Sequence, residues 1–131
     1  MQKLILDPTW ESTLSPADCE MIQEKFNRTV NEVERLVAVP IWRAVNHKGE
    51  LLITALIHNR TSEKITFMNQ QVAYIEEGNE MASCIFTIKR LVIGAHCSMP
   101  WTFIFPRGTF LEKQLVIQGR EEVKAGELKF S

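Results

Sequence analysis

Short apolar segments separated by turns fill the chain from residue 36 to its end. The clearest is ELLITALIHN (residues 50–59), in which Leu51 and the alternate residues that follow it share one face of an extended strand. The opposite face, which includes Leu56, is also largely apolar, so we expect a central strand whose second face is covered by another element. Turn sequences such as NHKG (46–49) interrupt the pattern at short intervals. This organisation favours an antiparallel β-sandwich over parallel βαβ units.

Other segments with the same alternation extend the prediction to most of the chain. Pro40 restricts the first of them to a sheet edge or a β-bulge, because proline donates no backbone hydrogen bond. Alternate residues from Met99 to Phe105, including Trp101, line one face and are expected in the core. We expect KITFM and QQVAYIE to form either two short strands or one bent strand. The predicted strands are LVAVPIWRAV (36–45), KITFM (64–68), QQVAYIE (70–76), EMASCIFTI (80–88), MPWTFIF (99–105), KQLVI (113–117) and ELKF (127–130).

One helix is predicted before the strands, over residues 16–28. Ser15 is a favourable N-cap, and Pro16 suits the first helical position. Ile22 and Phe26 lie four residues apart and therefore share one face of the helix. This helix is the element that we expect to cover the second face of the central strand.

Length and charge place limits on the class of protein. A chain of 131 residues suits one domain with one core, which we divide into an extended lead-in and helix (1–34) and a sandwich (35–131). Its 15 basic and 16 acidic residues give a net charge of −1, which argues against a nucleic-acid-binding protein. The N-terminal apolar run Leu4–Leu6 is too short for a signal peptide, and no segment is long enough to span a membrane. We therefore expect a cytoplasmic protein without membrane insertion.

Candidate metal and catalytic residues do not form a recognisable site. His96 and Cys97 are neighbours, but successive side chains of an extended segment point to opposite faces and cannot form a thiolate–imidazolium pair. The glutamate pairs 76–77 and 121–122 are expected to be solvated rather than set across a cleft. The cysteines and histidines lack zinc-ligand spacing, so we expect reduced thiols, no metal and no cofactor; they are Cys19, Cys84, Cys97, His47, His58 and His96.

Partner contacts are predicted at Trp42, Arg43 and His47. If Pro40 places its strand at an edge, Trp42 would lie half exposed there, with Arg43 beside it and His47 in the following turn. Tryptophan and arginine are enriched among the residues that dominate binding energy at protein interfaces. An edge strand also offers unpaired backbone groups to which a partner segment can add as a further strand.

Three stretches carry a resemblance to a known family: DPTWESTLSPADCEMI (7–22), IWRAVNHKGELLITALIHNRTSEKITF (41–67) and SMPWTFIFPRG (98–108). In this order and spacing they resemble the bacterial SLAP domain, which is named for S-layer assembly proteins of the accessory Sec secretion system in Firmicutes. The resemblance implies an immunoglobulin-like β-sandwich with one N-terminal helix. It also implies a non-enzymatic protein linked to the export of S-layer or other cell-surface proteins, and it supplies no catalytic residues.

Two functions follow as expectations. The first is a protein–protein interaction module, an accessory or adaptor in secretion, whose partners are secretion components, exported proteins or a second copy of the chain. Proteins tied to S-layer export can carry several such domains, whereas this chain holds one. The alternative is a module that binds a small ligand or a carbohydrate through exposed Trp10, Trp42 and Tyr74.

Overall fold

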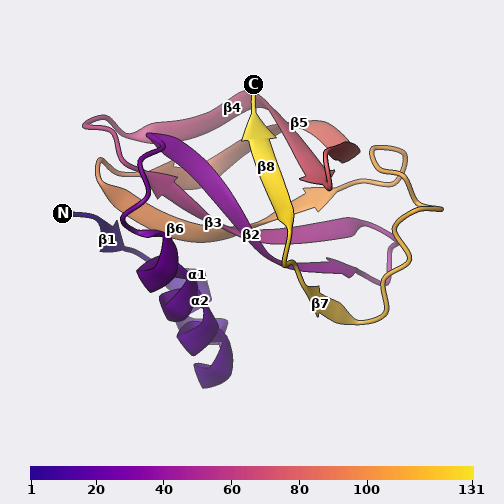
Figure 1. Cartoon of the computed structure of the whole chain (residues 1–131), viewed down its shortest axis with the longest axis horizontal. Helices are drawn as coiled ribbons and strands as arrows, with labels where there is room; N and C mark the ends of the chain where they lie inside the picture. Colours follow the sequence, from indigo (N-terminus) through magenta and orange to yellow (C-terminus); the bar gives the residue numbers. More distant parts are fainter.

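The computed structural model describes all 131 residues and contains two helices and eight strands (Figure 1). The fold is mainly β, as expected, and both helices precede all of the long strands. In chain order the elements are β1 (Lys3–Leu4), α1 (Pro8–Thr13), α2 (Pro16–Thr29), β2 (Leu36–Val45), β3 (Leu51–Asn59), β4 (Ile65–Glu76), β5 (Asn79–Ile93), β6 (Cys97–Phe105), β7 (Arg120–Glu122) and β8 (Gly126–Phe130).

Helix α2 confirms the helix that the sequence predicts. The Ser15 hydroxyl accepts a hydrogen bond from the backbone N–H of Asp18 at 3.1 Å, and Pro16 occupies the first turn. At the other end, the guanidinium of Arg60 donates to the carbonyl of Thr29 at 2.6 Å. A cation at this position satisfies a free helix carbonyl and complements the negative end of the helix dipole.

Helix α1 shows that the expectation of an extended lead-in, and of a single N-terminal helix, is wrong. Asp7 is its N-cap, and the carboxylate accepts from the backbone N–H of Thr9 at 2.9 Å. Pro8 follows at the first helical position, so the start repeats the Ser15–Pro16 arrangement of α2. The helix is short and none of its residues is fully buried.

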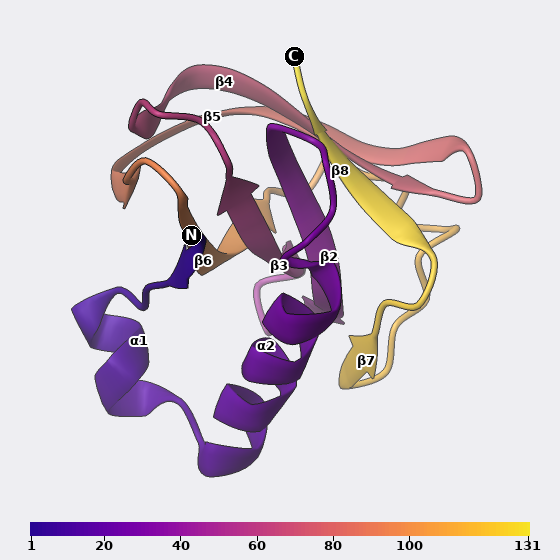
Figure 2. The same ribbon diagram turned by 60° about the vertical axis from the view of Figure 1, so that its left-hand side comes forward.

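All eight strands belong to one hydrogen-bonded sheet with the order β1-β6-β3-β2-β8-β4-β5, and β7 pairs with β2 outside this path. The sheet curls, so that β4 and β5 arch over β2, β3 and β6 (Figures 1 and 2). Strand β8 joins the two halves, because it pairs along β4 and also with β2 at Ala38. The result is a half-barrel, and the expected immunoglobulin-like sandwich of two separate sheets is not confirmed. The sheet is also mixed rather than antiparallel throughout, since β1 runs parallel to β6.

The central strand is β3, as predicted, with β2 on one side and β6 on the other. Leu51 and its alternate neighbours enter the main core, while Leu56 on the opposite face packs with Ile22 of α2. Strand β2 is not an edge strand, because β7 and β8 pair along its second side. Pro40 instead lies at a β-bulge, where the register with β3 shifts.

The main core fills the space between the two halves of the sheet. Phe103 of β6 contacts Phe67 of β4 and Phe86 of β5, with ring centroids 5.8 and 5.4 Å apart. Met99 and Phe105 are buried beside it, as the stripe in the sequence predicts, whereas Trp101 is only partly buried.

The remaining strand predictions have mixed outcomes. KITFM and QQVAYIE form one strand, β4, whose register shifts make it the bent strand that was one of the two alternatives. ELKF is part of β8. KQLVI forms no strand, although Leu115 within it reaches the core. Neither helix has the length and apolar composition that crossing a membrane requires.

Candidate functional site

A buried polar network joins the N-terminal segment, β3, β6 and α2. The Thr29 hydroxyl donates to the carbonyl of Lys25 at 2.7 Å, so its only hydrogen is used there. Nε2 of His58 must therefore carry a proton and donate to Thr29 Oγ1 at 2.7 Å. The unprotonated Nδ1 then accepts from the Ser98 hydroxyl at 2.6 Å, and Ser98 Oγ accepts from Nε2 of Gln2 at 3.1 Å.

This network holds His58 in its neutral form. Burial disfavours the imidazolium, and the nearby positive charge of Arg60 adds to the effect, so the pKa of His58 falls from 6.5 to about 4. A serine beside an imidazole is an arrangement used in nucleophilic catalysis. Here both Ser98 and His58 have no exposed surface, and every nitrogen of the ring has a partner. The pair therefore acts as a structural link between sheet and helix.

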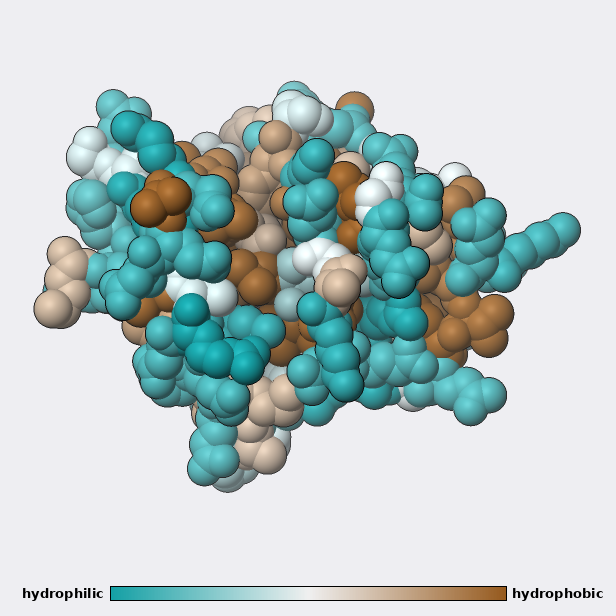
Figure 3. Space-filling view, in the orientation of Figure 1, coloured by the Kyte–Doolittle hydropathy of each residue, from teal (hydrophilic) through white to brown (hydrophobic).

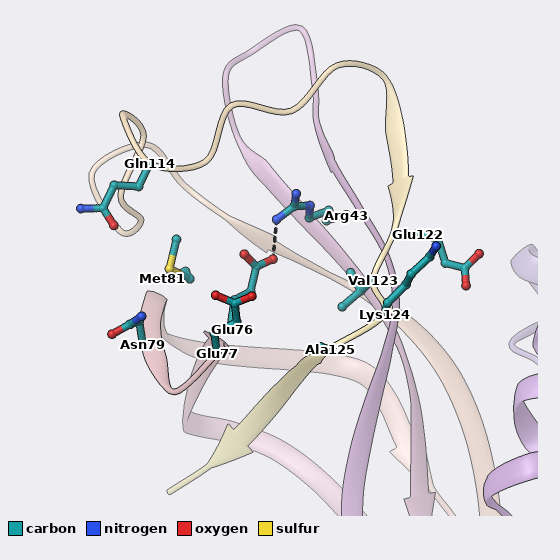
Figure 4. Close-up of a pocket in the computed structure, with 10 residues that line it drawn as sticks. All are labelled: Arg43, Glu76, Glu77, Asn79, Met81, Gln114, Glu122, Val123, Lys124 and Ala125. Atoms are coloured by element: carbon teal, nitrogen blue, oxygen red, sulfur yellow. Dashed lines mark hydrogen bonds and ion pairs between the residues drawn. The ribbon is translucent and has the colours of Figure 1, made fainter.

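Arg43 lines a polar pocket of about 430 Å³ at one end of the half-barrel (Figure 4). Its guanidinium pairs with Glu76 at 2.5 Å and with Glu121 at 2.9 Å, and the Tyr74 hydroxyl also donates to Glu76. Burial lowers the pKa of Arg43, but the two carboxylates more than offset this and the net shift is upward. Burial and the Glu76 contact both raise the pKa of Tyr74. Glu76 and Glu121 are thus ion-paired, not simply solvated as the sequence suggested.

The three residues predicted to contact a partner are not brought together on one exposed surface. Trp42 is only 5% exposed, because it packs against α2 and the guanidinium of Arg120 lies over its ring at 4.1 Å. Arg120 in turn binds Asp18 with two hydrogen bonds of 2.9 and 3.0 Å, which lowers the pKa of that carboxyl. His47 lies exposed in the turn after β2. Trp42 therefore does not take the half-exposed position that an edge strand would give it, and the role of the three residues in binding stays a prediction.

The other residues weighed from the sequence occupy separate places. His96 takes a positive φ of 55° in the turn before β6, and Cys97 begins the strand. No group of three or more histidine, cysteine, aspartate or glutamate side chains is arranged to hold a metal ion. Of the aromatic residues proposed as a ligand platform, Tyr74 is fully buried and Trp10 is partly buried.

An apolar groove lies where the half-barrel stays open. It has a volume of about 380 Å³ and is formed by α1, β5 and β6. Trp10 of α1 stacks on Trp101 of β6, with ring centroids 6.3 Å apart. Ile104 is 47% exposed at the rim. We call this the β6 groove; it is lined by Trp10, Phe86, Ile88, Trp101, Thr102 and Ile104.

Unpaired backbone groups border the β6 groove. The carbonyl of Ser98 accepts from the backbone N–H of Ile5 at 2.8 Å, so even-numbered residues of β6 direct their backbone groups away from β3. Pro100 agrees with this parity, because its missing N–H would point to the same side. Strand β1 ends at Leu4, and no other strand pairs with this side of β6. The N–H and C=O groups of Thr102 and Ile104 therefore form a free edge.

Sequence reasoning missed this site because it considered only one face of β6. Trp101 was assigned to the core with its alternate neighbours, and the residues between them were given no role. Two signals were present in the chain. Ile104 adds an apolar side chain to the second face, and the Asp7–Pro8 helix start places Trp10 on a helix rather than an extended segment.

The face that carries β8 and α2 is mostly hydrophilic, with apolar residues in separate patches (Figure 3). It therefore offers no continuous apolar surface comparable to the β6 groove.

Comparisons with known proteins give one match. No curated protein and no solved structure is significantly similar to the chain. The family model described as the SLAP domain matches residues 4–121, which include both helices, β2 to β6 and most of β7. The chain therefore belongs to the SLAP domain family.

Proposed function

We propose that the chain is a protein-interaction module that binds an extended apolar polypeptide segment by strand addition to β6. The observation that carries this proposal is the free edge at Thr102 and Ile104, which lies directly beside the apolar β6 groove. The N–H and C=O groups of an extended polypeptide have the same spacing as those of the free edge, so the two can form hydrogen bonds. The alternate side chains of the added strand can enter the groove. A client segment would add one strand to an incomplete barrel.

The alternative, a small-ligand or carbohydrate module, has less support. Arg43 in the polar pocket is already ion-paired with Glu76 and Glu121. Trp42 and Tyr74 are buried and cannot serve as a stacking platform for a sugar.

The clients that fit this proposal are exported or cell-surface proteins and components of their secretion machinery. The support is family membership together with the resemblance to domains of the accessory Sec system, and no catalytic role is needed for it. Precursors on the way to export are extended and expose apolar segments that a folded protein would bury. A cytoplasmic module with an open sheet edge would pair with such segments.

Replacing Ile104 with lysine is expected to abolish this binding. A lysine at the rim of the β6 groove must lose water when a strand covers it, and charged side chains on edge strands oppose strand pairing. The measurement is a crosslinked affinity purification from cells that express the chain naturally, followed by mass spectrometry. The wild-type chain should recover exported precursors or secretion components, and Ile104→Lys should lose them.

Val116→Lys provides the matched control, because Val116 is 77% exposed and lies outside the groove. It should recover the same proteins as the wild type. Equal recovery by Ile104→Lys would show that the β6 groove is not the binding surface. If the wild type recovers neither exported nor secretion proteins, the link to secretion is wrong.

A further inference from the structure

Residues 1–14, which we call the N-terminal arm, cover one end of the exposed side of β6. The backbone N–H of Lys3 donates to the carbonyl of His96 at 3.0 Å, and that of Ile5 donates to Ser98 at 2.8 Å. The pairing of β1 with β6 is parallel and covers only Lys3 and Leu4. Parallel pairing is slightly less stable per residue than antiparallel pairing. The arm and a client strand would compete for the same side of β6.

Side-chain hydrogen bonds, one ion pair and apolar packing hold the arm in place. The Gln2 side chain donates to the carbonyl of Asn59 at 3.0 Å and to Ser98. Asp7, which is buried, pairs with Arg90 at 2.7 Å, and the same guanidinium donates to the hydroxyl of Thr9 at 2.9 Å. Helix α1 has no fully buried residue. Leu4, Trp10 and Leu14 of the arm are partly buried against the smaller core cluster that contains Ile22 and Leu56. Trp10 also stacks on Trp101, which forms one wall of the β6 groove.

The arm cannot itself complete the barrel. Strand β1 pairs Lys3 with Cys97 and Leu4 with Ser98, a constant offset of 94 residues. Continued in this register, Pro8 would stand opposite Thr102. Asp7 and Pro8 instead start α1 and lead the chain away from β6. The free edge thus begins beyond the point where α1 leads the arm away from β6.

We infer that the N-terminal arm is a displaceable strap, and that a client strand takes the place of β1, parallel to β6, and continues to Thr102 and Ile104. This rests on the function proposed above. The client is an extended segment with apolar residues at alternate positions and without proline where it must donate to β6. Displacing the arm lifts Trp10 from Trp101 and opens the groove to the client's side chains.

The chain provides its own means to lock the arm. Because β1 places Lys3 opposite Cys97, the variant Lys3→Cys can form a disulfide with the native Cys97. Neighbouring strands have Cα atoms about 5 Å apart, within the range that a disulfide spans. Cys19→Ser and Cys84→Ala remove the other thiols. The same variant in its reduced form is the matched control.

The probe is a fluorescent synthetic peptide that carries residues 1–6 of the chain, MQKLIL, followed by Thr-Val-Thr-Val where the chain would start α1. Anisotropy titration measures its affinity. A chain that lacks residues 1–6 should bind it about tenfold more tightly than the full chain, because the competing arm is gone. The oxidised Lys3→Cys variant should bind about tenfold more weakly than the reduced one. A peptide that is N-methylated at the alternate residues whose N–H groups would face β6 should bind neither the full chain nor the shortened chain.

The outcomes separate this inference from the proposed function. Equal affinity of the oxidised and reduced variants would overturn the strap, while strand addition at the β6 groove would stand. Absence of binding to the full chain, the shortened chain and the reduced variant alike would overturn the proposed function itself. If the shortened chain fails to fold, the comparison of the oxidised with the reduced variant still decides.

Discussion

Phe103→Ala is expected to lower the free energy of unfolding by about 3–5 kcal/mol, the range for removing a buried phenylalanine ring. Phe103 has no exposed surface and lies on β6, in the lower half of the sheet. It contacts Phe67, Phe86 and Phe130, which belong to β4, β5 and β8. Its ring therefore packs between the two halves of the sheet. Urea unfolding, followed by circular dichroism, measures the loss.

The neighbouring residue offers a matched control for this substitution. Ile104 is on the same strand but points to the other face and is 47% exposed. Ile104→Ala should cost less than about 1 kcal/mol, because little apolar surface leaves the interior. If the two substitutions cost the same, the aromatic cluster does not hold the half-barrel together.

Stability is expected to fall by about 3 kcal/mol between pH 6.5 and pH 4 through His58 alone. Above pH 6.5 the imidazole is neutral in both states and contributes no pH dependence. As the pH falls below 6.5, the unfolded chain binds a proton, but the folded chain does not until its pKa of about 4. The gap between these two pKa values corresponds to about 3 kcal/mol, and no further loss arises from this group below pH 4.

Comparison with His58→Gln isolates this effect. Glutamine does not titrate, so the variant should be less stable at pH 7, where it lacks the full network, but should lose less stability on acidification. Carboxylates such as Asp18 also change the stability at low pH. Their contributions are the same in both proteins and cancel when the two stability curves are subtracted. His47→Gln replaces a histidine in an exposed turn, outside the network, and serves as the control substitution. A His58→Gln curve parallel to the wild type would mean that His58 titrates normally in the folded chain.

The buried network also bears on the N-terminal arm. Ser98 donates its hydroxyl hydrogen to the neutral imidazole of His58 and accepts a hydrogen bond from Gln2 of the arm.

The sequence shows neither the burial of His58 nor its hydrogen-bond partners, since Thr29 and Ser98 lie far from it in the chain. Hydrophobic periodicity reports which face a residue takes, but not which polar groups meet there.

Local patterns predicted most of the elements. The Ser15–Pro16 start located α2, alternation located β2 to β6, and Leu56 on the second face of β3 indicated that a helix covers it. These predictions succeeded because capping and side-chain alternation depend on neighbours in the chain. Helix α1 was missed although its Asp7–Pro8 signal was equally local. The apolar pattern of KQLVI predicts a strand, but the segment places Leu115 in the core without strand geometry.

The sequence by itself determined that the chain is mainly β, that a helix packs on its central strand, and that it carries the stretches typical of a SLAP domain. Only the tertiary structure decided that one curled sheet forms, that β2 is internal and Trp42 buried, and that β6 keeps a free edge beside an apolar groove. The reason is physical. Alternation specifies which face of a strand is buried, whereas strand order depends on pairings between residues far apart, whose energies no local pattern records.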